Sequence, residues 1–168
     1  PRSTLFPYTT LFRSDTAAMT AFATMHDAPG SCGYRFELSD GQTCAVCTDL
    51  GCVTPEVKKG VYGADLVLLE ANYDPNMLRN GPYPEMLQER IRGKYGHLSN
   101  GDSAGMAEAL IAHGTTRLIL GHLSENNNTM PLAQQTVLEH LQEQGMRRNQ
   151  DFLLQVSSPE GLKQAVIF

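Results

Sequence analysis

A nearly continuous apolar run at 65–69, with the sequence DLVLL, limits most strongly how this chain can fold. A strand with one solvent-exposed face alternates apolar and polar residues, whereas a strand buried on both faces is apolar throughout. The segments before and after this run alternate between strand-like and helix-like patterns. This alternation predicts an α/β architecture.

The other expected elements follow from periodicity and capping residues. Strands are expected at 34–38, 43–48, 117–121, 152–156 and 165–168, after a short apolar run at 19–25. Helices are expected at 53–62, at 85–92, from a capping-box-like start at Ser99 to Gly114, and from Pro131 to near Gly145. Asp40 and Gly41 predict a hairpin turn between the strands at 34–38 and 43–48.

Length and composition are those of one globular domain or a large piece of one. The chain has 168 residues, 41% of them hydrophobic and 18% charged, and a formal net charge of −5. This charge argues against a surface that coats nucleic acid broadly, but bound metal ions can supply local positive charge at a phosphate site. No apolar run approaches the ~20 residues of a membrane-spanning helix, so we expect a cytoplasmic protein without a membrane partner.

The first fourteen residues differ in origin from the rest, by our interpretation. The segment at 4–14 resembles the translation of a common sequencing-library adapter. We therefore expect 1–14 to be an artefact and 15–168 to be a partial domain whose native chain continues upstream of Asp15.

Four cysteines raise the question of a zinc or redox site: Cys32, Cys44, Cys47 and Cys52. Cys44 and Cys47 form a C-x-x-C, but they lie on an expected strand, where side chains three positions apart point to opposite faces. The favoured interpretation is small buried thiols in a reducing cytosol. A non-catalytic module that binds one zinc through these cysteines stays open as the alternative.

Chemically active side chains occur where four apolar runs end. His26, Asp49, Glu70 and His122 follow the runs that end at 25, 48, 69 and 121. Ligands of open α/β sheets bind outside the carboxyl ends of the strands, and nitrogen and carboxylate donors together suit zinc or manganese. Singly, each residue could be a surface histidine, a turn or a helix-start carboxylate. Their shared placement favours one site.

At these residues the sequence resembles the metallo-β-lactamase-fold hydrolases, and among them the YycJ/WalJ group. The resemblance rests on five stretches, which are MHDAPGSCGYRF (25–36), CTDLGCVTPEV (47–57), DLVLLEANYDPNML (65–78), NGPYPEMLQERIRGKYGHLSN (80–100) and LILGHLSENNNTMPLA (118–133). They cover most of the chain after residue 14. The resemblance implies the C-terminal half of an αββα sandwich, without the first half.

The resemblance also implies roles for individual residues. His26, Asp49 and His122 match the last three ligands of a centre with two zinc or manganese ions, in which Asp49 bridges both ions. His97 matches a histidine near the scissile phosphate and Glu70 the acid that orients it, so His97 is expected to act as a general acid or as a phosphate contact. The implied reaction is hydrolysis of a phosphodiester by a hydroxide that the two metal ions activate.

Other polar residues near these motifs receive weaker expectations. Asn126 and Asn127 could contact substrate, although asparagines after a strand also make ordinary turns. His113 precedes a helix-ending glycine and His140 lies in a polar helical stretch, and both are expected to be structural.

One departure from the family pattern stands out. No His-x-His-x-Asp-His motif occurs among the five histidines, so only three of the seven ligands that the family implies are present. The intact parent is expected to be a 5′ to 3′ DNA exonuclease, and the chain as given to be inactive and unstable or prone to associate. Hydrolysis of RNA or of small esters by the same site is the second enzymatic hypothesis.

Overall fold

The computed structural model describes residues 10–158 and 161. One mixed sheet of seven strands forms the centre, with the strands in sequence order from β1 to β7. The strands are β1 (Thr10–Arg13), β2 (Ala17–Ala23), β3 (Cys32–Leu38), β4 (Thr43–Cys47), β5 (Leu66–Glu70), β6 (Arg117–Gly121) and β7 (Leu153–Val156). The helices are α1 (Pro55–Val61), α2 (Pro75–Asn80), α3 (Glu85–Arg92), α4 (Asn100–Ala112) and α5 (Met130–Glu143).

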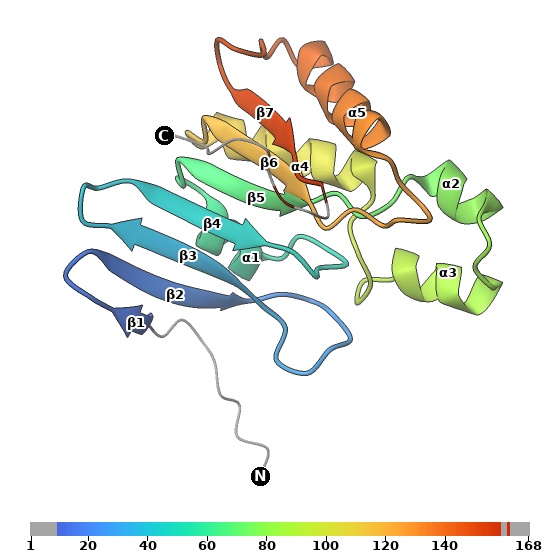
Figure 1. Cartoon of the computed structure of the whole chain (residues 1–168), viewed down its shortest axis with the longest axis horizontal. Helices are drawn as coiled ribbons and strands as arrows, with labels where there is room; N and C mark the ends of the chain where they lie inside the picture. Colours follow the sequence, from blue (N-terminus) through green and yellow to red (C-terminus); the bar gives the residue numbers. More distant parts are fainter. Residues whose placement is uncertain (1–9, 159–160, 162–168) are drawn as a thin grey trace.

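The sheet changes direction in its middle. Strands β1 to β4 pair antiparallel, whereas β4 to β7 pair parallel through helical crossovers. Strands β2, β4, β5 and β6 therefore run the same way, and their carboxyl ends meet at the edge of the sheet beside α2 and α3 (Figure 1). This arrangement confirms the predicted α/β class.

The core lies between one face of the sheet and α1, α4 and α5. Its strand side chains include Ala45, Val67, Leu69, Leu118 and Leu120, all at most 1% exposed. A smaller apolar cluster of Tyr73, Leu78 and Ile91 joins α2 to α3 at the carboxyl edge. No described helix covers the opposite face of the sheet (Figure 1). No described helix has the length and apolar character needed to cross a membrane.

Capping residues explain where the helices begin. Thr54 accepts a hydrogen bond from the Val57 amide, so the helix expected at 53–62 begins at Pro55. Ser99 and Asp102 form the expected capping box at the start of α4. The short helix α2, which the sequence analysis does not include, begins after Asp74, whose carboxylate accepts two backbone hydrogen bonds.

Three further differences concern the ends of the chain and of one strand. Residues Thr10–Arg13, inside the segment interpreted as an adapter remnant, form the edge strand β1 against β2. The origin of residues 1–14 stays a prediction. Strand β5 lies one residue further along the chain than expected, at Leu66–Glu70, so Glu70 is its last residue rather than the first residue after it. The strand expected at 165–168 lies outside the described residues.

Candidate metal centre

The carboxyl edge of the sheet carries the side chains that the sequence analysis places there. His26 lies beyond β2, Asp49 beyond β4, and His122 directly after β6, while Glu70 ends β5. His97 comes from the loop between α3 and α4, and its ring centroid lies 4.8 Å from that of His26 and 5.2 Å from that of His122. The structure therefore brings all five residues into one cluster.

Asp49 is the centre of this cluster. The Nε2 atom of His26 lies 3.7 Å from Asp49 Oδ1, and the Nε2 atom of His122 lies 3.8 Å from the same oxygen. The two imidazoles thus approach a single carboxylate from different strands of the sheet.

The ring of His26 is fixed by the loop that carries His97. Its Nδ1 lies 2.9 Å from the carbonyl oxygen of Gly96, so Nδ1 carries the hydrogen and donates it. The Nε2 atom then faces Asp49. A histidine that ligates a metal uses its second nitrogen in the same manner, to hold the ring and its tautomer.

Glu70 lies beneath the cluster and contacts both His97 and His122. Its side chain is fully buried, His97 Nδ1 lies 2.6 Å from Oε1, and the Leu50 amide donates to Oε2 at 3.0 Å. Burial raises the pKa of Glu70, but the contacts with His122 and His97 and the hydrogen bond from Leu50 outweigh it and hold the pKa below its ordinary value. Glu70 is therefore an ionised acceptor that orients the His97 ring.

His122 and Asp49 both have left-handed backbones, with φ values of 56° and 57°. Residues with a β-carbon seldom adopt this conformation. At His122 the backbone is held by Asn72, whose side-chain amide donates to the His122 carbonyl oxygen at 2.8 Å. The contact of His122 with Glu70 raises the pKa of His122 against the opposing effect of burial.

Buried asparagines support the loops of the cluster; Asn128 lies in the asparagine run that follows His122, whereas Asn100 was not singled out from the sequence. The side-chain amides of Asn100 and Asn128 pair reciprocally at 2.8 and 3.0 Å, and Asn128 also donates to the carbonyl oxygen of Ala71. These bonds tie the start of α4 to the loops after β5 and β6. In the sequence, the sign of this support is that an asparagine occurs in each of the stretches EANYD, GHLSN and ENNN.

The two asparagines expected to contact substrate form hydrogen bonds within the protein. Asn127 is fully buried, and its side-chain amide lies 3.3 Å from the hydroxyl of Ser124. The side chain of Asn126 donates to the Tyr83 hydroxyl at 3.0 Å. The expected contact of these residues with substrate stays a prediction.

The two other histidines make structural contacts. His113 stacks on Tyr62 with the ring centroids 3.8 Å apart, and His140 Nε2 lies 2.7 Å from a carboxylate oxygen of Glu108. Asp27 also lies beside the cluster, although it was not expected from the sequence as a site residue. It pairs with Arg90 of α3 and lies 3.5 Å from Nε2 of His26.

The cysteines do not gather. All four thiols are free, and Cys47 is buried while Cys44 points to the other face of β4. Among the described residues, the two groups that could hold a metal ion contain only histidine and acidic side chains, namely His26, Asp49 and His97, and Glu70, His97 and His122.

The donor set fits a divalent cation. Imidazole nitrogens and carboxylate oxygens are the ligands that zinc and manganese take in proteins. His26 and His122 present Nε2 to Asp49, while the Nδ1 atoms of His26 and His97 are occupied by hydrogen bonds to acceptors. The arrangement therefore combines accessible donors with a hydrogen-bonded support behind them.

The fold and this site together define a protein of the metallo-β-lactamase class. Residues 7–123 match the family model described as the Beta-lactamase superfamily domain, and the chain belongs to that superfamily. It is 36% identical to the exodeoxyribonuclease WalJ of Streptococcus pneumoniae serotype 2 (strain D39 / NCTC 7466), over 83% of this chain and 52% of that protein. It is 33% identical to the exodeoxyribonuclease YycJ of Bacillus anthracis, over 83% of this chain and 53% of that protein.

Solved structures agree on the fold. The Zn(2+)-bound PqqB of Methylobacterium extorquens superposes with a TM-score of 0.54 at 20% identity, over 89% of this chain and 47% of that one. The short form of human tRNase Z superposes with a TM-score of 0.51 at 22% identity, over 70% of this chain and 40% of that one. The chain spans about half the length of the curated relatives that it matches.

Proposed function

We propose that this chain carries part of the active site of a metal-dependent phosphodiesterase. The observation that carries the proposal is the approach of His26 and His122 to one oxygen of Asp49 from two strands. A carboxylate has two oxygens and can bridge two cations, which an imidazole cannot do. We assign His26, Asp49 and His122 as ligands of two divalent ions, zinc or manganese.

The chemistry follows from the positions of the protein groups. Two divalent ions at this site would produce a nucleophile from water at neutral pH and neutralise charge on a phosphodiester. His97 holds a proton near the cluster and gives it to the leaving oxygen. Glu70, which is ionised and buried, fixes the ring of His97 in the required orientation.

We propose DNA as the substrate and 5′ to 3′ exonucleolytic cleavage as the reaction of the intact protein. The names of the two similar proteins, both exodeoxyribonucleases, support DNA over RNA or small esters. We also propose a cytoplasmic location, which the four free cysteines support because thiols persist in a reducing compartment.

The chain as given should be inactive on its own. It lacks a His-x-His-x-Asp-His motif, so no further histidine pair is available to complete two ion sites. A single partial site would bind a metal ion without holding it in the geometry that cleavage needs.

Metal binding tests the site directly. Zinc affinity of the purified chain should fall more than about 100-fold in Asp49→Asn and His26→Ala, because each change removes a donor atom. His140→Ala is the matched control, since His140 contacts Glu108 on the helical side. Cys44→Ser should also leave the affinity unchanged, and loss of zinc in that variant alone would favour the cysteine module instead.

A nuclease assay tests the activity. With zinc or manganese and a 5′-labelled DNA duplex, the chain should show no turnover above the Asp49→Asn variant. Robust, metal-dependent turnover would contradict the proposed inactivity. If that turnover survived in Asp49→Asn and His122→Ala, the assignment of the active site would be wrong as well.

A further inference from the structure

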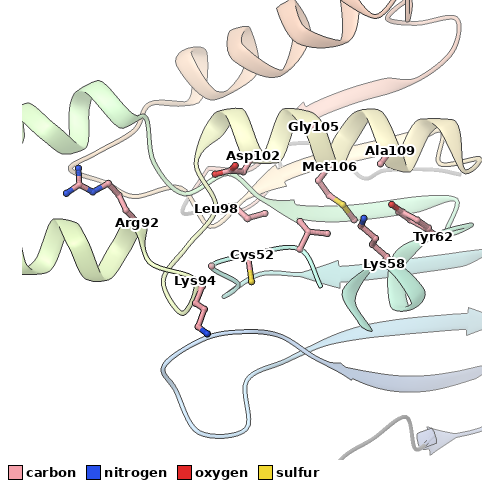
Figure 2. A pocket seen from close by; sticks show the side chains of 12 residues that line it. Cys52, Lys58, Tyr62, Arg92, Lys94, Leu98, Asp102, Gly105, Met106 and Ala109 are labelled. Atoms are coloured by element: carbon pink, nitrogen blue, oxygen red, sulfur yellow. The ribbon is translucent and has the colours of Figure 1, made fainter. Parts of the chain in front are cut away.

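A second hollow lies on the helical side of the sheet, between α1 and α4. It has a volume of about 550 Å³, within the range typical of small-molecule sites. We call it the α1–α4 groove. Figure 2 shows its lining, of which Lys58, Tyr62, Arg92, Lys94, Leu98 and Met106 define the chemical character of the groove.

The charges of the groove oppose those of the whole chain. The chain has a net charge of −5, yet the groove is lined by three cations, Lys58, Arg92 and Lys94, and by one acid, Asp102. Asp102 is engaged in the capping box of α4, with Ser99 Oγ 2.5 Å from its carboxylate. Within residues 10–158, no salt bridge joins any of the three cations to an acidic side chain.

The cations lie toward opposite ends of an apolar floor. Arg92 and Lys94 are at the end near α3, and Lys58 is at the other end beside Tyr62 (Figure 2). Leu98 and Met106 line the space between them. This pattern fits a ligand with negative groups at its ends and a flat or apolar body in the middle.

The groove is separate from the metal centre, although the same two loops form both. A β-carbon placed on Gly51 would lie 2.5 Å from backbone atoms of Gly93, Lys94 and Gly96, so the loop after β4 and the loop before α4 are in direct backbone contact. In these loops, the side chains of Asp49 and His97 belong to the metal cluster, whereas Cys52, Lys94 and Leu98 line the groove.

We propose that the α1–α4 groove binds the phosphates of a nucleotide unit, with one phosphate at the end that carries Arg92 and Lys94, the next at Lys58, and the nucleoside against Leu98 and Met106. The requirement for an anion comes from the geometry of the groove alone, while the choice of a nucleotide rests on the proposed function. A nucleic-acid strand presents successive phosphates with a base between them, and a free mononucleotide presents one phosphate.

Gly105 allows a test that leaves the fold intact. It lies on α4 in the lining of the groove, and a β-carbon there would meet no atom within 4 Å. Gly105→Glu places a carboxylate in the lining of the groove, and Gly105→Gln adds a neutral side chain of the same size. Both replacements favour the helix relative to glycine.

Binding should be measured by fluorescence anisotropy of a labelled single-stranded ten-nucleotide DNA, and by calorimetric titration of deoxyadenosine 5′-monophosphate. EDTA should be present throughout, so that the metal centre does not contribute. Lys58→Gln and Lys59→Gln form a matched pair, because both lysines are exposed on α1 and only Lys58 lines the groove.

We expect Gly105→Glu to raise the Kd of the oligonucleotide more than about tenfold relative to Gly105→Gln, because the new carboxylate repels the phosphates that the cations bind. Lys58→Gln should lower the slope of log K against log salt by about 0.7, the value for one phosphate contact on a single strand, and Lys59→Gln should not. Binding of the oligonucleotide alone would identify the ligand as a strand with successive phosphates. Equally tight binding of deoxyadenosine 5′-monophosphate, with the same variant effects, would show that one phosphate is enough and that the assignment of two phosphates is wrong.

Two results would overturn the proposal. One is the absence of binding by the unaltered chain to either probe. The other is equal binding by Gly105→Glu and Gly105→Gln, which would place the nucleic acid elsewhere. Failure of the proposed metal-dependent function would instead appear as unchanged zinc affinity in Asp49→Asn, a measurement that does not involve the groove.

Discussion

At the scale of single residues, the cluster depends on side chains that hold other side chains. His26 is fixed by a backbone carbonyl, His97 by Glu70, and the backbone of His122 by Asn72. His26, Asp49, Glu70 and His122 were predictable because histidine and acidic side chains at strand ends indicate a site. His97 lies in a loop between two helices, and only the family resemblance indicated it. Asn72 was not predictable, because asparagine after a strand is also typical of an ordinary turn.

Asn72→Ala should reduce the free energy of unfolding by about 1–3 kcal/mol, because a carbonyl in a left-handed segment loses its buried donor. Urea denaturation measures this change. Asn80→Ala is the control, since the exposed side chain of Asn80 bonds only to its own helix at Asn76. Equal losses in the two variants would mean that Asn72 does not support the His122 loop.

Cys47 makes stability depend on pH in the alkaline range. Burial raises the pKa of its thiol to about 12, with a further contribution from the charge of Glu70. The unfolded thiol ionises near pH 8.5, so this stability is complete below that pH and is lost as pH rises toward 12, by about 1.4 kcal/mol per pH unit. Urea titrations between pH 8 and 10 should show a shallower decline for Cys47→Ala than for the unaltered chain.

At the scale of elements, local signals predicted some boundaries and tertiary contacts set the others. The capping box at Ser99 predicted the start of α4 because its hydrogen bonds are local. The helix α2 has only six residues, too few for an apolar period to show, although Asp74 followed by Pro75 is a helix-start signal. The extension of β5 to Glu70 depends on its pairing with Gly121 of β6, a contact distant in sequence.

The two loops behind the cluster should tolerate no side chain at Gly51. Gly51→Ala would force its new methyl group against the backbone between Gly93 and Gly96, and overpacking of this kind costs about 1–3 kcal/mol. Thermal unfolding should show the loss, and zinc affinity should fall with it because Asp49 and His97 move apart. Gly101→Ala is the control, since its nearest neighbour would be Ser99 Oγ at 3.8 Å.

At the scale of the whole molecule, the described helices cover one face of the sheet. On the opposite face, Tyr34, Val46 and Leu68 are register partners across β3, β4 and β5, and all three are half-buried. The sequence predicted this layer from the apolar run at 65–69 but could not show which strands line up beside it, because register depends on pairings between distant segments.

An apolar row of this kind should make the chain self-associate as its concentration rises. Sedimentation velocity measures the association. Val46→Lys should weaken it more than about tenfold, because a charge would be buried at the contact. Gln142→Lys adds the same charge to the exposed side of α5 and should have no effect. A monomer at all concentrations would contradict the expectation.

The left-handed backbones of Asp49 and His122 mean that folding and function make opposite demands at two positions. Glycine adopts this conformation without a steric penalty, so a library screened only for thermal tolerance should accumulate His122→Gly. The backbone of His122 carries a steric penalty that glycine would not have. Directed evolution for thermal stability alone would therefore replace residues of this cluster first, unless metal binding were selected at the same time.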